Sequence, residues 1–342
     1  MGIKSLAQDL GLSIATVSRA LNNHPEVSAQ TRLRVQAAAQ ARAYAPNQSG
    51  RSLRKGRHNT IGLMLPPKSS HENYTWSLFL TLAEGIQTRI ASEDLELVLF
   101  QNRDDADELA RLKRVVERRL VDGLVLAGTR RKDERLDYIA AQGFPYVALG
   151  RSSSGGEHAW MDLDFELGVA QVVGSLVARG HQRIALCTPQ DDAMQGHLMR
   201  KGYRGAMRRH GLVVADGLVG REELSERGGH REIHRLLALP EPPTAVILQS
   251  DCMAIGAYGG LHERGLQPGR DMAIFGGVLT GELAQYLSPR LSGFSVDLRP
   301  LGARLAEALL VRMAAADAGT PVAGFQQLWP LNILQGGSDV AG

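Results

Sequence analysis

The stretch Ser5–Asn22, which reads SLAQDLGLSIATVSRALN, decides the fold of the N-terminal part of this chain. Apolar residues recur at helical spacing on both sides of Gly11, a residue type that readily ends a helix. Ser13 stands where a helix N-cap is needed, so its hydroxyl can bind the first N–H groups of a helix from about Ile14 to Asn22. The sequence therefore predicts a helix-turn-helix, whose second helix would read DNA.

A third helix is predicted after Val27, with Ser28 as its N-cap. Its apolar face would pack on the first two helices and consists of Leu33, Val35, Ala38 and Ala39. Pro46 limits this helix, because the residue before a proline avoids helical geometry. The following residues, 47–57, are too few and too polar to form a stable isolated helix. The sequence thus predicts a helical head at residues 1–46 and a linker at 47–57.

Charge supports this prediction independently of the apolar pattern. Up to Arg57 the chain has nine Lys or Arg and two acidic residues, a net charge of +7. The whole chain of 342 residues carries only +3, so the remainder carries −4. A basic head on an acidic body is typical of a phosphate-binding module joined to a domain that binds something else.

The rest of the chain alternates between short aliphatic or β-branched runs and segments with helical spacing. The predicted strands are 60–65, 95–100, 121–126, 146–149, 184–187, 245–248, 273–275 and 291–296. Strands that alternate with helices form parallel sheets flanked by helices. The length of this part is enough for two α/β lobes, and the pattern predicts that they divide at about His158.

Several function classes lack support in the sequence. Cys187 and Cys252 lie in apolar runs. We therefore expect them to be core residues of a protein that works in a reducing compartment. No signal peptide or transmembrane run is found, so we expect a cytoplasmic, nucleoid-associated protein with no membrane partner. The ten histidines are scattered, and no nucleophile–base pair, metal spacing or phosphate loop stands out. We therefore expect no catalytic activity, no metal site and no cofactor.

The motif LSIATVSRALN and its continuation through RSLRKGRHNTIGLMLP resemble the LacI/GalR family of bacterial transcription regulators, with Leu12 in place of the family's valine. The resemblance implies a hinge helix at 47–57, in which Gly50 replaces the usual alanine. It also implies a two-lobed core like that of periplasmic binding proteins. Its first lobe would comprise 58–158 and about 293–327, and its second 159–292 and about 328–342.

The resemblance assigns DNA contacts to the head and the hinge. Ile14 and Ala15, together with Arg19, match the positions that discriminate base pairs in the family. Leu53 matches an apolar wedge in the minor groove. The full set of predicted DNA contacts is Ser13, Ile14, Ala15, Thr16, Ser18, Arg19, Asn22, Arg51, Leu53 and Arg54.

Ligands of two-lobed α/β proteins bind near the C-terminal ends of the strands. Asp164, Asp251 and Asp297 match pocket positions of the family, although each could instead cap a helix. Arg130, Arg151 and Arg200 would suit an anion if they converged. The predicted effector contacts are Ser69, Tyr74, Trp76, Thr129, Arg151, Asp164, Met199, Arg200, Ser250, Asp251, Val278 and Asp297.

These features together predict a DNA-binding transcriptional regulator, most simply a repressor. It would bind a palindromic operator in double-stranded DNA as a homodimer or a higher oligomer, since one head makes too small a footprint. A small-molecule effector, a carbohydrate or a derivative, would control it. Two alternatives stay open: a purine or organic anion acting as co-repressor, and a plain small-molecule binding module.

Overall fold

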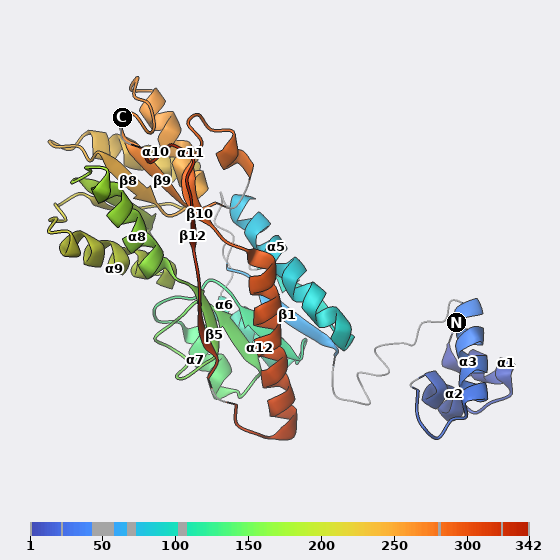
Figure 1. Cartoon of the computed structure of the whole chain (residues 1–342). Helices are drawn as coiled ribbons and strands as arrows, with labels where there is room; N and C mark the ends of the chain where they lie inside the picture. The colour runs from blue at the N-terminus through green and yellow to red at the C-terminus, as the bar shows by residue number, and fades with distance from the viewer. Residues whose placement is uncertain are drawn as a thin grey trace. The chain divides into compact units, whose positions relative to one another are not determined.

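The computed structural model describes residues 2–21, 23–42, 58–66, 73–101, 108–279, 282–322 and 324–340, without the side chains of residues 73–75 and 282. Two compact units are present, Met1–His58 and Asn59–Gly342. Figure 1 shows the helices of the first unit and the layered α/β body of the second. Within the described residues, every helix is too short or too polar to span a bilayer.

The N-terminal unit contains α1 (Ile3–Leu10), α2 (Ile14–Leu21) and α3 (Ala29–Ala41). Gly11 ends α1 in the left-handed conformation, with φ of 64°, which glycine adopts without steric cost. The Ser13 hydroxyl accepts a hydrogen bond from the backbone N–H of Thr16 at 3.0 Å. Ser28 accepts one from Thr31 at 3.2 Å. Both predicted caps are therefore confirmed.

A small apolar core joins α1, α2 and α3. Its buried members are Leu6, Ala7, Val17, Ala20, Val27, Val35 and Ala39. Leu33, which the sequence analysis assigned to this core, is 67% exposed, so that assignment is wrong. Residues two apart on a helix point in different directions, and Val35 takes the buried side.

The first lobe is a parallel sheet in the order β11-β5-β4-β3-β1-β2. Its strands are β1 (Thr60–Met64), β2 (Glu96–Phe100), β3 (Gly123–Leu126), β4 (Tyr146–Leu149), β5 (Trp160–Leu163) and β11 (Gln326–Trp329). One apolar core lies between this sheet and the adjacent helices α5 (Asn73–Ile90) and α12 (Leu298–Ala318). A second core joins the other face to α6 (Glu108–Glu117) and α7 (Glu134–Ala141). A 3₁₀ turn, η1 (Ala91–Glu93), follows α5.

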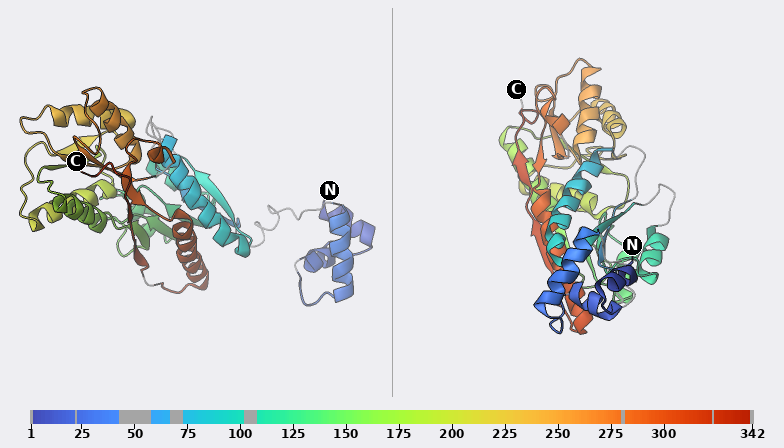
Figure 2. Two further views of the ribbon diagram at one scale, coloured as in Figure 1. Left: turned by 45° about the horizontal axis from the view of Figure 1, so that its top comes forward. Right: turned by 90° about the vertical axis from the view of Figure 1, so that its right-hand side faces the viewer.

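The second lobe repeats this plan with the order β12-β10-β9-β8-β6-β7. Figure 2 shows the two-lobed body from two further directions. Its strands are β6 (Ile184–Pro189), β7 (Val219–Glu222), β8 (Ala245–Leu248), β9 (Ala273–Val278), β10 (Ser292–Ser295) and β12 (Asn332–Leu334). Neighbours are parallel except for β12, which runs antiparallel to β10. One face packs on α8 (Phe165–Ala178) and α9 (Met194–Arg209). The other packs on α10 (Glu226–Leu237) and α11 (Asp251–His262), and η2 (Glu282–Gln285) precedes β10.

The predicted fold class, a helical head with a two-lobed α/β core, is confirmed. Each run that the sequence analysis assigned as a strand overlaps one, although β6 and β9 extend beyond their predicted runs. The strands β5, β7, β11 and β12 lie outside those runs. They are the short strands with the most mixed composition, which period-two or aliphatic patterns do not reveal.

The chain crosses between the lobes after β5, after β10 and after β11. Leu163 and Val296, at the first two crossings, pack against the cores of both lobes. The backbone N–H of Asp164 donates to the carbonyl of Trp329 at 2.9 Å, which joins the first crossing to the third.

These crossings correct the lobe boundaries of the sequence analysis, which lay at 158/159, 292/293 and 327/328. The strand β5 pairs with β4, and therefore extends the first lobe to residue 163. The strand β10 pairs with β9 in the second lobe, so only α12 and β11 return to the first. The sequence pattern predicted β10 but not β5, and it carried no information on which strands pair.

Candidate nucleic-acid interface and ligand site

The helix α2 has one buried and one exposed face. Val17 and Ala20 are completely buried in the core of the head. Ile14 is 44% exposed, and Ala15 and Arg19 are also exposed. The apolar side thus holds α2 on the head, and the opposite side presents the residues predicted to discriminate base pairs.

The start of α2 carries a side-chain cap from Ser13. The hydroxyls of Ser13 and Thr16 lie 2.9 Å apart, and Ser18 is half-buried on the next turn. The N-terminus of a helix attracts anions through its N–H groups and its dipole. The start of α2 therefore offers a binding position for an anion.

Arg19 makes an ion pair with Glu26 at 3.4 Å, with both side chains more than half exposed. Exposed ion pairs contribute at most about 1 kcal/mol, so Glu26 holds Arg19 weakly. Arg32, in contrast, donates to the carbonyls of His24 and Val27 at 3.0 and 3.2 Å. Its guanidinium therefore braces the turn before α3, whereas that of Arg19 is available for another acceptor.

Part of the predicted site lies outside the described residues. This applies to the linker and hinge at 47–57 and to Asn22, Arg51, Leu53, Arg54 and Ser69. The backbone of Tyr74 belongs to α5, but its side chain is also outside the described set.

Backbone hydrogen bonds join the strand ends of the two lobes. The N–H of Met194, at the start of α9, donates to the carbonyl of Thr129 at 2.9 Å. The N–H of Arg131 donates to the carbonyl of Asp192 at 3.2 Å. Thr129 is only 5% exposed. The loops after β3 and β6 therefore meet where the sequence analysis placed the effector.

A buried ion network lies behind the first of these loops. Arg130 pairs with the carboxylate of Glu108. Arg135, 2% exposed, pairs with Glu108 and with Asp133, both at 2.7 Å. Burial opposes ionisation of Asp133, but hydrogen bonds and charge from Arg135 outweigh it and lower the pKa of this carboxyl. Arg130, whose side chain is 42% exposed, thus lies at the solvent edge of this network.

Arg151, at the end of β4, pairs with Asp162 on β5 at 2.7 Å. Its guanidinium also lies over the ring of Trp160, 5.6 Å from the centroid. Burial raises the pKa of Asp162, and Arg151 counteracts this. Arg151 therefore has partners within the first lobe, and its buried Nη2 has no hydrogen-bond partner among the described residues.

The strand ends of the second lobe hold a separate polar cluster. Arg200 donates to the hydroxyl of Thr188 at 2.6 Å, and burial together with nearby Arg221 lowers the pKa of Arg200. Gln249 is 3% exposed, and its Oε1 has no hydrogen-bond partner among the described residues. A Cβ at Gly196 would lie 3.1 Å from Arg200 Nη1 and 3.5 Å from Gln249 Oε1. Glycine there leaves space beside both polar atoms.

Sequence reasoning missed Thr188 and Gln249. Both stand at the C-terminal ends of strands, and Gln249 directly precedes the predicted pair Ser250 and Asp251. The available signal for Gln249 was an amide side chain directly after the aliphatic run 245–248, where a polar residue is expected to face a ligand site.

All three predicted aspartates lie at helix starts, and two of them, Asp164 and Asp297, are at N-cap positions. Asp164 caps α8, because its Oδ1 accepts a hydrogen bond from the N–H of Leu167 at 3.2 Å. Asp297 is exposed at the start of α12, where its side chain makes no capping bond. The structural role that the sequence analysis allowed for Asp164 is therefore observed.

Ser250 and Asp251 begin α11. Ser250 accepts a hydrogen bond from the N–H of Met253 at 3.4 Å. Asp251, 3% exposed, accepts one from the N–H of Cys252 at 2.9 Å. A backbone bridge links Ser250 to Val278 at the end of β9. These residues are brought together, with their polar atoms engaged in local bonds.

Met199 is completely buried in the apolar core of the second lobe. Its prediction as an effector contact is wrong, because α9 turns this side chain toward the sheet and leaves Arg200 at the polar cluster. Val278 is 6% exposed and packs in the same core. Trp76 is partly buried against the core of the first lobe.

Comparison with known proteins identifies the family. Residues 2–47 match the bacterial regulatory proteins of the lacI family, and residues 173–338 match the periplasmic binding protein-like domain. The chain is 35% identical to the HTH-type transcriptional regulator RafR of Escherichia coli over 79% of each chain. The chain belongs to the LacI family of bacterial transcriptional regulators. Members of this family bind DNA and are not enzymes.

Two further relatives of this LacI-family regulator extend the comparison. The ribose operon repressor of Escherichia coli (strain K12) is 28% identical over 91% of this chain and 92% of its own. A crystal structure of the lac repressor dimer, bound to operator and the anti-inducer ONPF, superposes with a TM-score of 0.85. It is 24% identical and covers 100% of this chain and 99% of its own, which supports the fold.

Proposed function

We propose that this regulator is a repressor that binds a palindromic operator as a homodimer, with α2 in the major groove. The observation that carries this proposal is the exposed face of Ile14, Ala15 and Arg19. Arginine on guanine is the commonest specific contact, and small apolar side chains suit a thymine methyl. One head reads only a few base pairs, so two heads related by a two-fold axis are required for selectivity.

The proposal includes a small-molecule effector, a carbohydrate or its derivative, at the strand ends of the second lobe. The buried Oε1 of Gln249 lacks a partner among the described residues and would accept a hydrogen bond from a ligand hydroxyl. Buried polar groups without such a bond cost roughly 1–3 kcal/mol. The ribose operon repressor among the relatives supports the same ligand class.

An organic anion or a purine is the second candidate, favoured by a separate observation. Burial and the charges of Arg221 and Arg204 lower the pKa of Arg200, and the two arginines outweigh the opposing charges of Asp191 and Asp192 nearby. An anionic group of the ligand would relieve this repulsion and form charge-assisted hydrogen bonds. Such a ligand would be expected to act as co-repressor.

The effector would act by changing the arrangement of the two lobes. A ligand shifts such an equilibrium only when it binds the two arrangements with different affinities. The backbone bonds from Met194 to Thr129 and from Arg131 to Asp192 cross between the lobes. Their formation or loss is the structural change to which binding would couple. A repressor of this kind acts on chromosomal DNA in the cytoplasm.

Selection from random double-stranded DNA tests the operator proposal. The full chain should enrich palindromic sites bound by two chains. Arg19→Ala should lose discrimination at one base pair of each half-site, worth about 1–3 kcal/mol. Arg19→Lys is the matched control, because it retains the charge but lacks the planar fork that reads guanine. If Arg19→Lys selects the same sites as the wild type, Arg19 contacts phosphate instead.

Thermal unfolding of the full chain with sugars, sugar acids, sugar phosphates and purines tests the effector. A ligand at about 100 times its Kd stabilises the protein by roughly 2.7 kcal/mol. Gln249→Leu should remove the response to a neutral sugar, and Arg200→Gln the response to an anion. A response that survives in both variants would place the effector elsewhere.

A further inference from the structure

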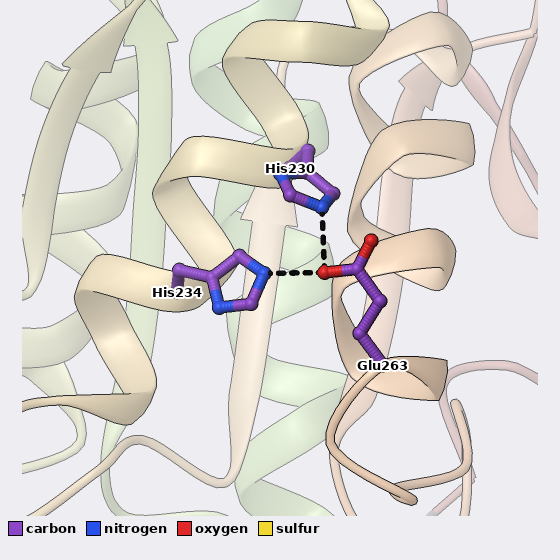
Figure 3. A group of neighbouring side chains, drawn as sticks. All are labelled: His230, His234 and Glu263. Carbon is purple, nitrogen blue, oxygen red and sulfur yellow. Dashed lines mark hydrogen bonds and ion pairs between the residues drawn. The ribbon is translucent and has the colours of Figure 1, made fainter.

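We propose that His230, His234 and Glu263 form a binding site for a divalent transition-metal ion such as zinc. The Nε2 atoms of both histidines lie 3.0 Å from Oε2 of Glu263. One ligand atom from each residue falls within 4.8 Å of the others. Figure 3 shows the two rings of α10 directed at the carboxylate that follows α11.

The residue types and spacing match the requirements of such an ion. His230 and His234 are four residues apart on α10 and therefore lie on one face of the helix. Imidazole nitrogen and carboxylate oxygen bind zinc at about 2.0–2.2 Å. In a tetrahedral site of that size, the ligand atoms are roughly 3.3–3.6 Å apart. An ion therefore fits after each histidine nitrogen moves a few tenths of an ångström away from Glu263 Oε2 and the two nitrogens, which lie within 4.8 Å of each other, take the same spacing.

Close backbone packing between α10 and α11 fixes the distance across the site. A Cβ at Gly229 would lie 1.9 Å from the carbonyl oxygen of Met253, and one at Gly256 would lie 1.7 Å from that of Glu226. The helices can approach this closely only because both positions are glycine. The third ligand, from a different helix, is thus held in place by rigid elements, which favours a preorganised site.

The local electrostatics also favour a cation. His234 lies in the last turn of α10, and Glu263 is the C-cap of α11. The C-terminal end of a helix carries partial negative charge from its carbonyl groups. Arg231, between the two histidines, is directed to Glu222 at 2.7 Å. Its charge is therefore balanced by its own partner.

The site is accessible and distinct from the polar cluster at the strand ends. The side chains of His230 and His234 are 37% and 28% exposed, so an ion can enter and retain water as a further ligand. Glu263 lies twelve residues beyond Asp251, which is roughly 18 Å along the helix. A bound ion would tie α10 to α11 and stabilise the second lobe, independently of effector binding.

Calorimetric titration of the chelator-treated full chain with zinc chloride tests the proposal. We expect one ion per chain at this site, and a higher unfolding temperature with zinc than without it. His230→Gln, His234→Gln and Glu263→Gln should each weaken binding by about tenfold or more. His262→Gln is the matched control, since its ring packs edge-on against Tyr258 and is not part of the group. It should bind zinc like the wild type.

Two results would overturn the proposal. One is the absence of stoichiometric zinc binding by the wild type. The other is unchanged affinity in the three substituted proteins, which would place the ion elsewhere. If a variant fails to fold, the wild-type spectrum with Co²⁺ decides: the intense visible absorption of a four-coordinate ion supports the site, and the weak absorption of a hexa-aquo ion contradicts it.

Discussion

Two regions proposed to bind partners differ in what determines the direction of their side chains. These are the exposed face of α2, here called its reading face, and the strand ends of the body. In the head, Ile14, Ala15 and Arg19 point away from the core, as the sequence predicts. In the body, Asp164 caps a helix and Met199 fills the core. The period of a short helix determines which residues face outward, whereas residues at strand ends also have to satisfy the backbone of the next helix.

The largest expected effect concerns Arg135 in the body. Arg135→Met leaves the buried carboxylates of Asp133 and Glu108 without this partner. Breaking a buried pair in this way costs about 3–5 kcal/mol of unfolding free energy. Chemical denaturation at neutral pH measures the loss. Arg131→Met, at an exposed neighbouring position, should stay within about 0.5 kcal/mol of the wild type.

The pH dependence of that loss identifies its source. The pKa of Asp133 is lowered in the folded protein. The ionised carboxylate therefore stabilises the fold fully at a pH above its pKa in the unfolded chain, near 4. This stabilisation is lost as the pH falls from there through the lower pKa of the folded protein. The difference between Arg135→Met and the wild type should therefore shrink below about pH 4. A difference that is constant from pH 7 to pH 3 would indicate a packing defect.

Met199→Ala should destabilise the body by about 2–5 kcal/mol, because it leaves a cavity in the apolar core of the second lobe. Met199→Leu, which nearly conserves volume, should cost less than about 1.5 kcal/mol. Denaturant unfolding of both variants is the measurement. If Met199→Ala keeps the wild-type stability and instead weakens effector binding, the original prediction of a ligand contact is restored.

Asp164→Ala removes the cap of α8 and should cost about 1 kcal/mol, whereas Asp164→Ser retains a capping oxygen and most of the stability. Thermal unfolding of the two variants separates them. If the serine variant is as stable as the wild type but no longer responds to the effector, Asp164 has both roles. The sequence prediction of Asp164 as an effector contact would then be correct in addition to its role as a cap, and the body would resemble the head in this respect.

The smallest effect on stability is expected for Ile14→Ala. The side chain is 44% exposed, so the unfolding free energy should change by no more than about 0.5 kcal/mol. Operator selection should nevertheless change at the base pair that Ile14 contacts. A loss of stability above 1 kcal/mol would mean that the reading face also supports the head.

The sequence predicted the head well because its determinants are local. The Ser13 and Ser28 caps and the break at Gly11 depend on residues within one helical turn. The fold class of the body was also predictable from alternating strands and helices. The assignment of β5 and β10 to lobes was not, because it depends on pairing between segments distant in sequence.

The metal-ligand group shows the same limit. The spacing of His230 and His234 was visible in the sequence, and a helical period would have placed both on one face. Glu263 comes from a separate helix and is brought to them by close packing at Gly229 and Gly256. Only two of the three ligands could have been inferred from local pattern.

The three crossings between the lobes have a consequence for synthesis on the ribosome. The head is complete once α3 has emerged. The first sheet lacks β11 until residue 329, and the second lacks β12 until residue 334. At about 5–20 residues per second, roughly 15–60 s separate the synthesis of α3 from the synthesis of the last strands of the two sheets. During that interval the nascent chain carries a folded helix-turn-helix head attached to two unfinished sheets, so the head is complete before the proposed effector site can form.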